Sequence, residues 1–126
     1  VLAEGLIELG VITQELDEAL DIEGGQLRRW YMHNTGHWIG LDVHDVGIYK
    51  PNGEPRLLEE GMCLTVEPGL YFGAWRPDVD CPERYANIGI RIEDDILVTS
   101  NGPDVLTKDC PKTISDLEAI IGKDFQ

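Results

Sequence analysis

Basic residues are scarce in this sequence of 126 residues. Ten lysines and arginines stand against twenty-four aspartates and glutamates, which gives a formal net charge of −14. Such an excess of negative charge repels phosphate backbones and anionic membrane surfaces, and it favours cations instead. We therefore expect no nucleic-acid partner and no membrane partner, and we interpret most of the acidic residues as a solvated surface.

Cysteines and long apolar runs are also few. The three cysteines, Cys63, Cys81 and Cys110, are an odd number at unrelated spacings, which argues against a disulfide framework and against a Cys-based zinc site. No apolar run approaches the ~20 residues of a membrane span. These absences predict a protein of the reducing cytoplasm.

The sequence does contain enough apolar residues for one small domain. Their share is 42%, which is normal for a globular core, so residues 1–126 are taken as one domain. Val1 is not an initiator methionine, and an apolar-periodic segment follows it without a capping residue ahead. We therefore expect the chain to be a fragment of something longer.

Helices are predicted at both ends of the chain. Leucines recur at helical spacing over residues 2–9 and stop at Gly10, which is typical of a glycine C-cap. A second helix is predicted between its cap, Thr13, and the glycine pair at residues 24–25 that ends it, with Leu16, Ala19 and Leu20 facing the core. A capping box of Thr113 and Asp116 predicts a last short helix that carries Ile114, Leu117 and Ile121, with Gly122 behind it.

Strands and loops are predicted between these helices. Glycines make a helix improbable over residues 30–49, and residues 51–60 indicate a polar loop. Residues 62–67 alternate, with Met62, Leu64 and Val66 on the apolar face and Cys63, Thr65 and Glu67 on the other. Residues 88–93 alternate as well, with isoleucines on the apolar face, and the strand continues to Val98. This order of helices, strands and a terminal helix predicts an α+β fold.

All three histidines of the chain, His33, His37 and His44, fall within one short stretch. If that stretch is extended, His33 and His37 can point to the same side, where an imidazole can bind a metal or polarise a carbonyl. The alternative is three unrelated histidines on the surface.

Glu67 and Glu93 each lie on the polar face of a predicted strand. A buried unpaired carboxylate costs several kcal/mol, so each implies a partner. A divalent cation would serve, and one histidine with two carboxylates suits Mn, Fe, Co or Zn better than Ca. An ordinary salt bridge with Arg91 would serve too, and the residues alone leave both interpretations open.

Three blocks of sequence carry a resemblance to a known family. They are HNTGHWIGLDVHDVG at residues 33–47, LTVEPGLY at 64–71 and GIRIEDD at 89–95. In this order they closely resemble the aminopeptidase P and prolidase branch of the pita-bread metallopeptidases, and the resemblance covers essentially the whole chain. It implies the C-terminal half of a pita-bread catalytic domain, an antiparallel sheet with helices on one side.

The resemblance also implies an activity. In that family two aspartates, one histidine and two glutamates hold two divalent ions, usually manganese. A metal-bound hydroxide then splits the bond between any first residue and a following proline, so the partners are peptides with proline at the second position. By motif position, His37, Glu67 and Glu93 would be metal ligands. His33 and His44 would flank the substrate, with His44 helping to hold the tetrahedral intermediate.

Arg91 and Tyr71 resemble residues that orient the ligands in this family. The two aspartate ligands of the family lie upstream of the first residue here. The aspartates beside the motifs are not ligands at the matching positions; they are Asp42, Asp45, Asp94 and Asp95. We therefore expect an incomplete metal site, little peptidase activity from the chain alone, and self-association as a homo-oligomer through uncovered strand edges.

Three alternatives remain at this point. Prolidases often carry a longer insertion between the histidine-rich block and the first glutamate strand than residues 49–62 provide, which favours an aminopeptidase. A catalytically dead pita-bread binding module usually loses ligands, whereas His37, Glu67 and Glu93 are intact. Methionine aminopeptidases share the fold but not the amino-acid sequence of residues 42–46 and 67–71.

Overall fold

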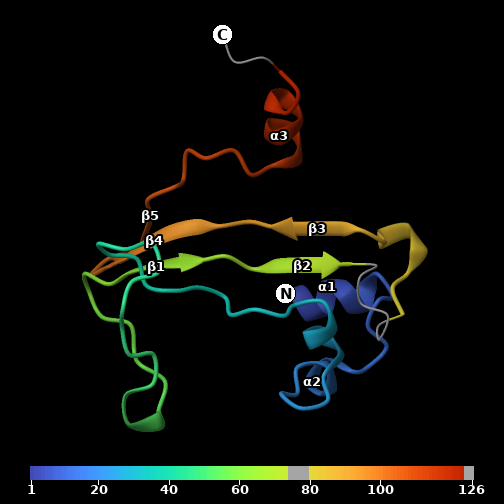
Figure 1. Cartoon of the computed structure of the whole chain (residues 1–126), viewed down its shortest axis with the longest axis horizontal. Coiled ribbons are helices and arrows are strands. Elements are labelled where there is room, and N and C mark those ends of the chain that lie inside the picture. The colour runs from blue at the N-terminus through green and yellow to red at the C-terminus, as the bar shows by residue number, and fades with distance from the viewer. Residues whose placement is uncertain (74–79, 124–126) are drawn as a thin grey trace. The chain divides into compact units, whose positions relative to one another are not determined.

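The computed structural model describes residues 1–73 and 80–123. The chain forms two compact units, which are described separately (Figure 1). Unit 1 combines residues 1–34 with residues 68–91, and unit 2 combines residues 35–67 with the chain from residue 92 onward. Each unit therefore joins two segments that are distant in the sequence.

Unit 1 begins with two short helices. Helix α1 (Leu2–Glu8) buries Ala3 and Leu6, and the chain leaves it through Gly10 at a φ of +69°, a conformation that favours glycine. Helix α2 (Leu16–Ala19) has Glu15 at its N-cap position without a side-chain capping bond, so the prediction of Thr13 as its cap is wrong. The Thr13 amide donates instead to the Gln26 side chain, at 2.8 Å. The helix also ends before the predicted glycine pair, and Leu20 is exposed rather than in the core.

The core of unit 1 gathers around one aromatic stack. Trp30 and Phe72 stack with ring centroids 5.0 Å apart, and both side chains are buried. Phe72 ends strand β2 (Gly69–Phe72), which pairs with strand β3 (Ile88–Arg91) in an antiparallel two-stranded sheet. Single 3₁₀ turns occupy Gln26–Arg29 and Glu83–Tyr85.

The isoleucines of β3 do not form the buried face that their alternation predicts. Ile88 is 42% exposed and Ile90 is 60% exposed. The physical reason is that the core residues of unit 1 gather around Phe72 on β2 and do not extend over β3. The predicted continuous strand also breaks after Arg91, because β3 pairs with β2, whereas the next strand, which starts at Asp94, pairs with other strands.

Unit 2 is built on a three-stranded antiparallel sheet. Its strands are β1 (Cys63–Val66), β4 (Asp94–Thr99) and β5 (Gly102–Val105), in the order β1-β4-β5. Residues 35–39 run antiparallel along the other edge of β1, held by backbone hydrogen bonds on both sides of the Trp38–Leu64 bridge. The predicted loop over residues 51–60 holds only a single 3₁₀ turn, Pro51–Gly53.

The C-terminal helix of unit 2 follows the capping prediction. Helix α3 (Ile114–Ile120) begins after Thr113, whose hydroxyl accepts a hydrogen bond from the Asp116 amide at 3.2 Å. Gly122 beyond its end has a φ of +76°. The order of helices, strands and terminal helix confirms the predicted α+β class.

At the C-terminal end of β1 the burial is the reverse of the predicted pattern, whereas Cys63 and Leu64 are both half-buried. Thr65 is only 2% exposed, whereas Val66, on the predicted apolar face, is 40% exposed. Thr65 can be buried at little cost because its hydroxyl has hydrogen-bond partners on two sides. The polar face of β1 is therefore the face that the site is built on.

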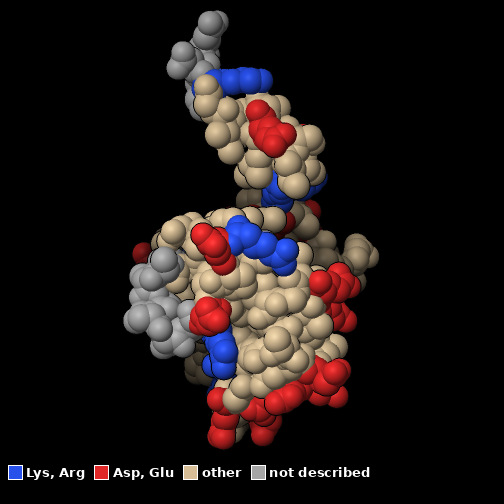
Figure 2. Space-filling view, turned by 90° about the vertical axis from the view of Figure 1, so that its right-hand side faces the viewer, with Lys and Arg blue, Asp and Glu red and all other residues tan. Residues whose placement is uncertain are grey.

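The surface is rich in acidic groups, which form several separate clusters on the face drawn in Figure 2. Basic side chains lie between some of them. None of the helices in residues 1–73 and 80–123 is long and apolar enough to cross a membrane.

Candidate metal centre

Two carboxylates face each other where β1 ends and β4 begins. The register of these strands pairs Thr65 with Asp95 and Val66 with Asp94, so one further step places Glu67 across from Glu93. Residues directly opposite in an antiparallel pair point to the same side of the sheet, and like charges in that position are destabilising. This arrangement favours a cation between the two carboxylates.

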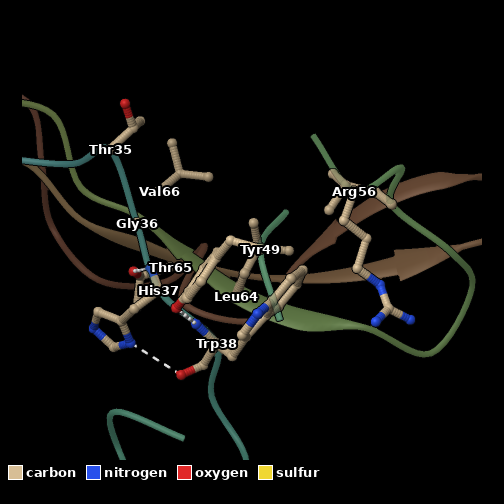
Figure 3. Close-up of a pocket in the computed structure, with 10 residues that line it drawn as sticks. Thr35, Gly36, His37, Trp38, Tyr49, Arg56, Leu64, Thr65 and Val66 are labelled. Carbon is tan, nitrogen blue, oxygen red and sulfur yellow. Dashed lines mark hydrogen bonds between the residues drawn. The ribbon is translucent and has the colours of Figure 1, made fainter. Parts of the chain in front are cut away.

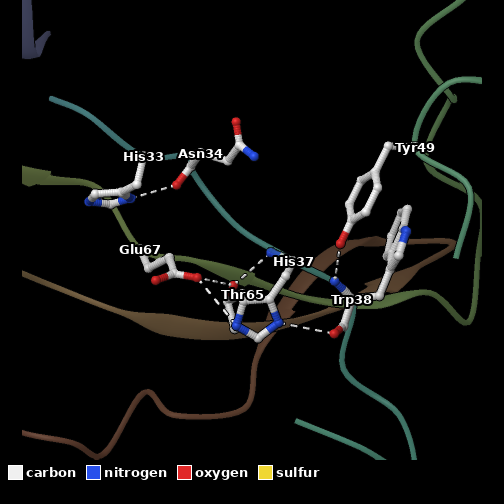
Figure 4. A network of polar contacts seen from close by, with 7 residues as sticks. All are labelled: His33, Asn34, His37, Trp38, Tyr49, Thr65 and Glu67. Carbon is white, nitrogen blue, oxygen red and sulfur yellow. Dashed lines mark hydrogen bonds and ion pairs between the residues drawn. The ribbon is translucent and has the colours of Figure 1, made fainter. Parts of the chain in front are cut away.

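His37 joins the carboxylates from the neighbouring segment. Its Nε2 lies 3.3 Å from Oε1 of Glu67, and the two side chains are 18% and 12% exposed (Figure 4). One ligand atom from each of His37, Glu67 and Glu93 lies within 4.8 Å of the others. The structure thus brings together the three residues that the motifs predict as metal ligands.

The hydrogen bond on the other side of the His37 ring defines what Nε2 can do. Nδ1 lies 3.0 Å from the carbonyl oxygen of Trp38. Since a carbonyl can only accept, the proton lies on Nδ1, and in the neutral ring Nε2 presents its lone pair. A lone pair beside a carboxylate is unfavourable without a proton or a cation between them. Metal-binding histidines are characteristically fixed in this way, by a carbonyl at the opposite nitrogen.

The donor set fits a divalent metal ion. One imidazole nitrogen and two carboxylate oxygens suit borderline ions such as manganese, cobalt or zinc. His37 and Glu67 are half-buried and Glu93 is exposed, so the cluster is held by the sheet on one side and open on another. Three protein ligands leave further coordination positions for other groups.

Thr65 contributes a hydroxyl to this cluster that sequence reasoning missed. Its Oγ1 receives the His37 amide at 3.0 Å and donates to Oε1 of Glu67 at 2.9 Å. Thr65 stood on the same predicted face as Glu67, and this shared face was the signal that could have found it.

Asp94 shows that a neighbouring aspartate can have a different use. Its carboxylate accepts hydrogen bonds from the Thr107 hydroxyl at 2.7 Å and from Lys112 at 3.0 Å. The Thr107 bond first, and then Lys112, hold the pKa of Asp94 below its ordinary value. Asp94 therefore anchors residues 107–112 to β4, in agreement with its exclusion from the predicted ligands.

His44 reaches the site from the loop after residue 39. Its ring lies against that of His37, with centroids 4.3 Å apart and the rings at 72°. Asp45, beside it, accepts the amides of Leu41 at 3.1 Å and Val46 at 2.8 Å. The Asp45 carboxylate thereby closes the turn that presents His44.

An aromatic pair supports the same loop. Trp38 and Tyr49 stack at 5.3 Å, and the Trp38 amide donates to the Tyr49 hydroxyl at 3.0 Å. Both residues line a pocket of about 200 Å³, together with Arg56 and Leu64 (Figure 3). The stack fixes the residue whose carbonyl holds the His37 ring.

The remaining predicted residues lie together in unit 1. The His33 ring makes an edge contact with Tyr71 at 5.5 Å, and the Arg91 guanidinium lies 5.7 Å from the Tyr71 ring centre. His33 Nδ1 is 2.7 Å from the Asn34 carbonyl, and its Nε2 is enclosed without a hydrogen-bond partner in the part of the chain that the structure describes. The lone pair of Nε2 is therefore available to a donor.

Comparison with known proteins places this geometry in context. The family model described as metallopeptidase family M24 matches residues 2–100. The chain is 47% identical over 118 residues to the Xaa-Pro aminopeptidase of Haemophilus influenzae and 46% identical over 121 residues to that of Escherichia coli. These alignments cover 94% and 96% of the chain but 26% of each relative, so the chain spans about a quarter of their length.

Solved structures agree with the sequence comparison. Aminopeptidase PepP of Pseudomonas aeruginosa superposes with a TM-score of 0.82 at 46% identity, covering 93% of this chain and 26% of that one. Escherichia coli aminopeptidase P with the inhibitor Pro-Leu gives 0.80 at 47% identity, covering 94% and 26%. These neighbours confirm the predicted pita-bread fold.

Proposed function

Because the chain belongs to metallopeptidase family M24, we propose that the whole protein hydrolyses the N-terminal Xaa-Pro bond of peptides with proline at the second position. The chain, in this proposal, is the C-terminal portion of the catalytic domain. The observation that carries the proposal is the convergence of His37, Glu67 and Glu93. The names of the similar proteins favour an Xaa-Pro aminopeptidase over a prolidase.

His37, Glu67 and Glu93 are the residues that would hold divalent metal, which the family implies. We propose two ions, with manganese as the native metal, and two aspartate ligands from the region upstream of residue 1. Bound divalent ions polarise a substrate carbonyl and activate water at neutral pH. The chain alone is then expected to have little or no activity.

The other residues act on the substrate and on the ligands. His44 touches the His37 ring, so we place it where it donates a hydrogen bond to the oxygen that gains charge during attack. By motif position we place His33 beside the substrate, with its Nε2 as a hydrogen-bond acceptor. Tyr71 and Arg91 contact each other and serve to orient their neighbours.

The proposal includes the cellular compartment of the protein and its oligomeric state. All three cysteines, Cys63, Cys81 and Cys110, are free thiols, which supports a reducing compartment such as the cytoplasm. Exposed isoleucines at Ile88 and Ile90 support self-association into a homo-oligomer.

Substitution in the full-length protein tests the activity. His37→Ala and Glu93→Ala are each expected to reduce cleavage of an Xaa-Pro tripeptide at saturating manganese by a factor of at least about 100. Asp42→Ala, which removes an acid of the 33–47 block that is not a predicted ligand, is the matched control and should retain activity. Activity of either ligand variant within a few-fold of wild type would refute the assignment. Cleavage of Xaa-Pro dipeptides alone would instead indicate a prolidase, and an inert wild type with any divalent metal would indicate a binding module.

A further inference from the structure

The hydrogen bonds between residues 35–39 and β1 have one irregularity. On either side of it the bonds join main-chain atoms, since the Ile39 amide donates to the Cys63 carbonyl and the Glu67 amide donates to the Thr35 carbonyl. His37 lies across from Thr65 and accepts the Thr65 amide at 2.9 Å. The His37 amide, however, donates to the Thr65 hydroxyl at 3.0 Å. A side chain thus takes a place that a main-chain carbonyl normally has.

The direction of the next bond follows from the number of protons. A hydroxyl has one proton to donate, and Oγ1 of Thr65 already accepts the His37 amide. Its proton therefore goes to Oε1 of Glu67, 2.9 Å away, because a carboxylate can only accept. One directed chain runs from the His37 backbone through Thr65 to the Glu67 carboxylate (Figure 4).

We propose that Thr65 is a positioning residue for the metal centre, whose hydroxyl holds the His37 backbone and the Glu67 carboxylate in one fixed arrangement. The inference rests on the proposed function, because it assigns a role towards the same metal. Thr65 is 2% exposed, so water cannot readily replace its hydroxyl. Each of the two ligands has its own bond to the hydroxyl, so loss of the hydroxyl frees both ligands at once.

Cobalt titration of the full-length protein tests this role without relying on activity. Thr65→Val keeps the shape of the side chain and removes the hydroxyl, while Thr65→Ser keeps the hydroxyl. We expect Thr65→Val to weaken Co²⁺ binding by about 10- to 100-fold, the usual effect of removing a group that supports a metal ligand. The visible absorption bands of Co²⁺ bound to Thr65→Val should differ in shape from those of wild type. Thr65→Ser should have the affinity and the bands of wild type.

Thr99→Val is the matched control for losing a hydroxyl from the same sheet. Thr99 donates to the Gly102 carbonyl at 2.7 Å at the far end of the β4–β5 hairpin. Its loss should lower stability without changing the cobalt affinity or spectrum. If Thr99→Val weakens cobalt binding as much as Thr65→Val does, the effect is general destabilisation and the positioning role is overturned.

The outcomes separate this inference from the proposed function. If wild type binds no Co²⁺, both fail together. If wild type binds Co²⁺ and Thr65→Val binds it equally well with the same spectrum, the metal site stands and the role of Thr65 is wrong. If Thr65→Val does not fold, Thr65→Ser and Thr65→Ala are compared instead, since they differ only in the hydroxyl. Equal affinity of that pair also overturns the inference.

Discussion

Gly36 lies against the main-chain carbonyl of Thr65, in space that a methyl group cannot enter. A Cβ built on Gly36 would overlap the Thr65 carbonyl oxygen. The close approach is what lets the next residue, His37, reach Glu67 at the end of β1. A glycine is therefore required here by space rather than by an unusual φ.

The first prediction concerns Gly36→Ala. The added methyl group is expected to push residues 35–39 away from β1 and to lower the free energy of unfolding by about 1–3 kcal/mol, as overpacking does. Metal affinity should fall with it, because His37 moves with this segment. Chemical denaturation and a cobalt titration of the full-length protein measure both effects.

Gly5→Ala is the control for that experiment. Gly5 lies inside α1 with no atom within 4 Å of a built Cβ. Alanine there should raise the free energy of unfolding by about 0.5–1 kcal/mol and leave metal affinity unchanged. Wild-type metal affinity in Gly36→Ala would contradict the role given to the close approach.

The second prediction concerns the loop that presents His44. Asp45→Ala removes the acceptor of the Leu41 and Val46 amides, so His44 should lose its fixed position. In the role proposed for His44, its displacement is expected to lower kcat by a factor on the order of 10 to 100. Metal affinity should change little, because the Trp38 carbonyl that holds the His37 ring stays in place. Steady-state kinetics and cobalt titration together distinguish this variant from Thr65→Val.

Asp42→Ala is the matched control in the same loop. Asp42 is exposed, and its carboxylate makes no hydrogen bond within the described residues of this loop. It should keep wild-type kcat, and equal losses in the two aspartate variants would sink the specific role of Asp45.

The third prediction concerns pH and Asp21. Hydrogen bonds from the Gly24 amide first, and then the Glu23 amide, hold the pKa of Asp21 below its ordinary value. A carboxylate with a lowered folded pKa stabilises the fold above its ordinary pKa of about 3.9 and loses that effect as the pH falls through the folded pKa. Asp21→Asn should therefore lower the melting temperature at neutral pH, and the difference from wild type should vanish in strong acid.

Glu23→Gln removes an equal charge from the same turn and is the control. Only the backbone amide of Glu23 takes part in the bonds to Asp21. The melting temperature of Glu23→Gln should depend on pH as that of wild type does. A deficit in Asp21→Asn that persists unchanged in strong acid would show that the charge on Asp21 has no part in the effect.

Much of the fold follows from local sequence, and the exceptions have physical reasons. The helix end at Gly10 and the cap at Thr113 depend on a few neighbouring residues, and both predictions are confirmed. The cap at Thr13 is wrong because Gln26, thirteen residues away, takes its hydrogen bonds. Alternation predicts β3 as a strand but not its exposure, which depends on how far the core around Phe72 extends.

In the candidate site, too, some residues could be predicted from the sequence and one could not. The motifs predict His37, Glu67 and Glu93 as ligands, and the structure brings one ligand atom of each within 4.8 Å of the others. Thr65 has no motif role, and its burial depends on bonds to residues 28 positions before and two positions after it. The predicted face that Thr65 shares with Glu67 points to their contact, but the bond to the His37 amide depends on pairing between distant segments.

The last prediction uses the facing carboxylates themselves. Without metal, Glu67 and Glu93 repel each other across the strand pair, so Glu93→Gln is expected to be slightly more stable than wild type. With metal the order reverses, because a ligand that binds only the folded state adds about 2.7 kcal/mol at a concentration 100 times its Kd, and the variant forfeits most of that gain. Melting temperatures of full-length wild type and Glu93→Gln, each measured with chelator and with excess manganese, show whether the order of stability reverses. Equal stabilisation of both proteins by manganese would place the ion elsewhere, since a glutamine oxygen is a much weaker ligand than the carboxylate that it replaces.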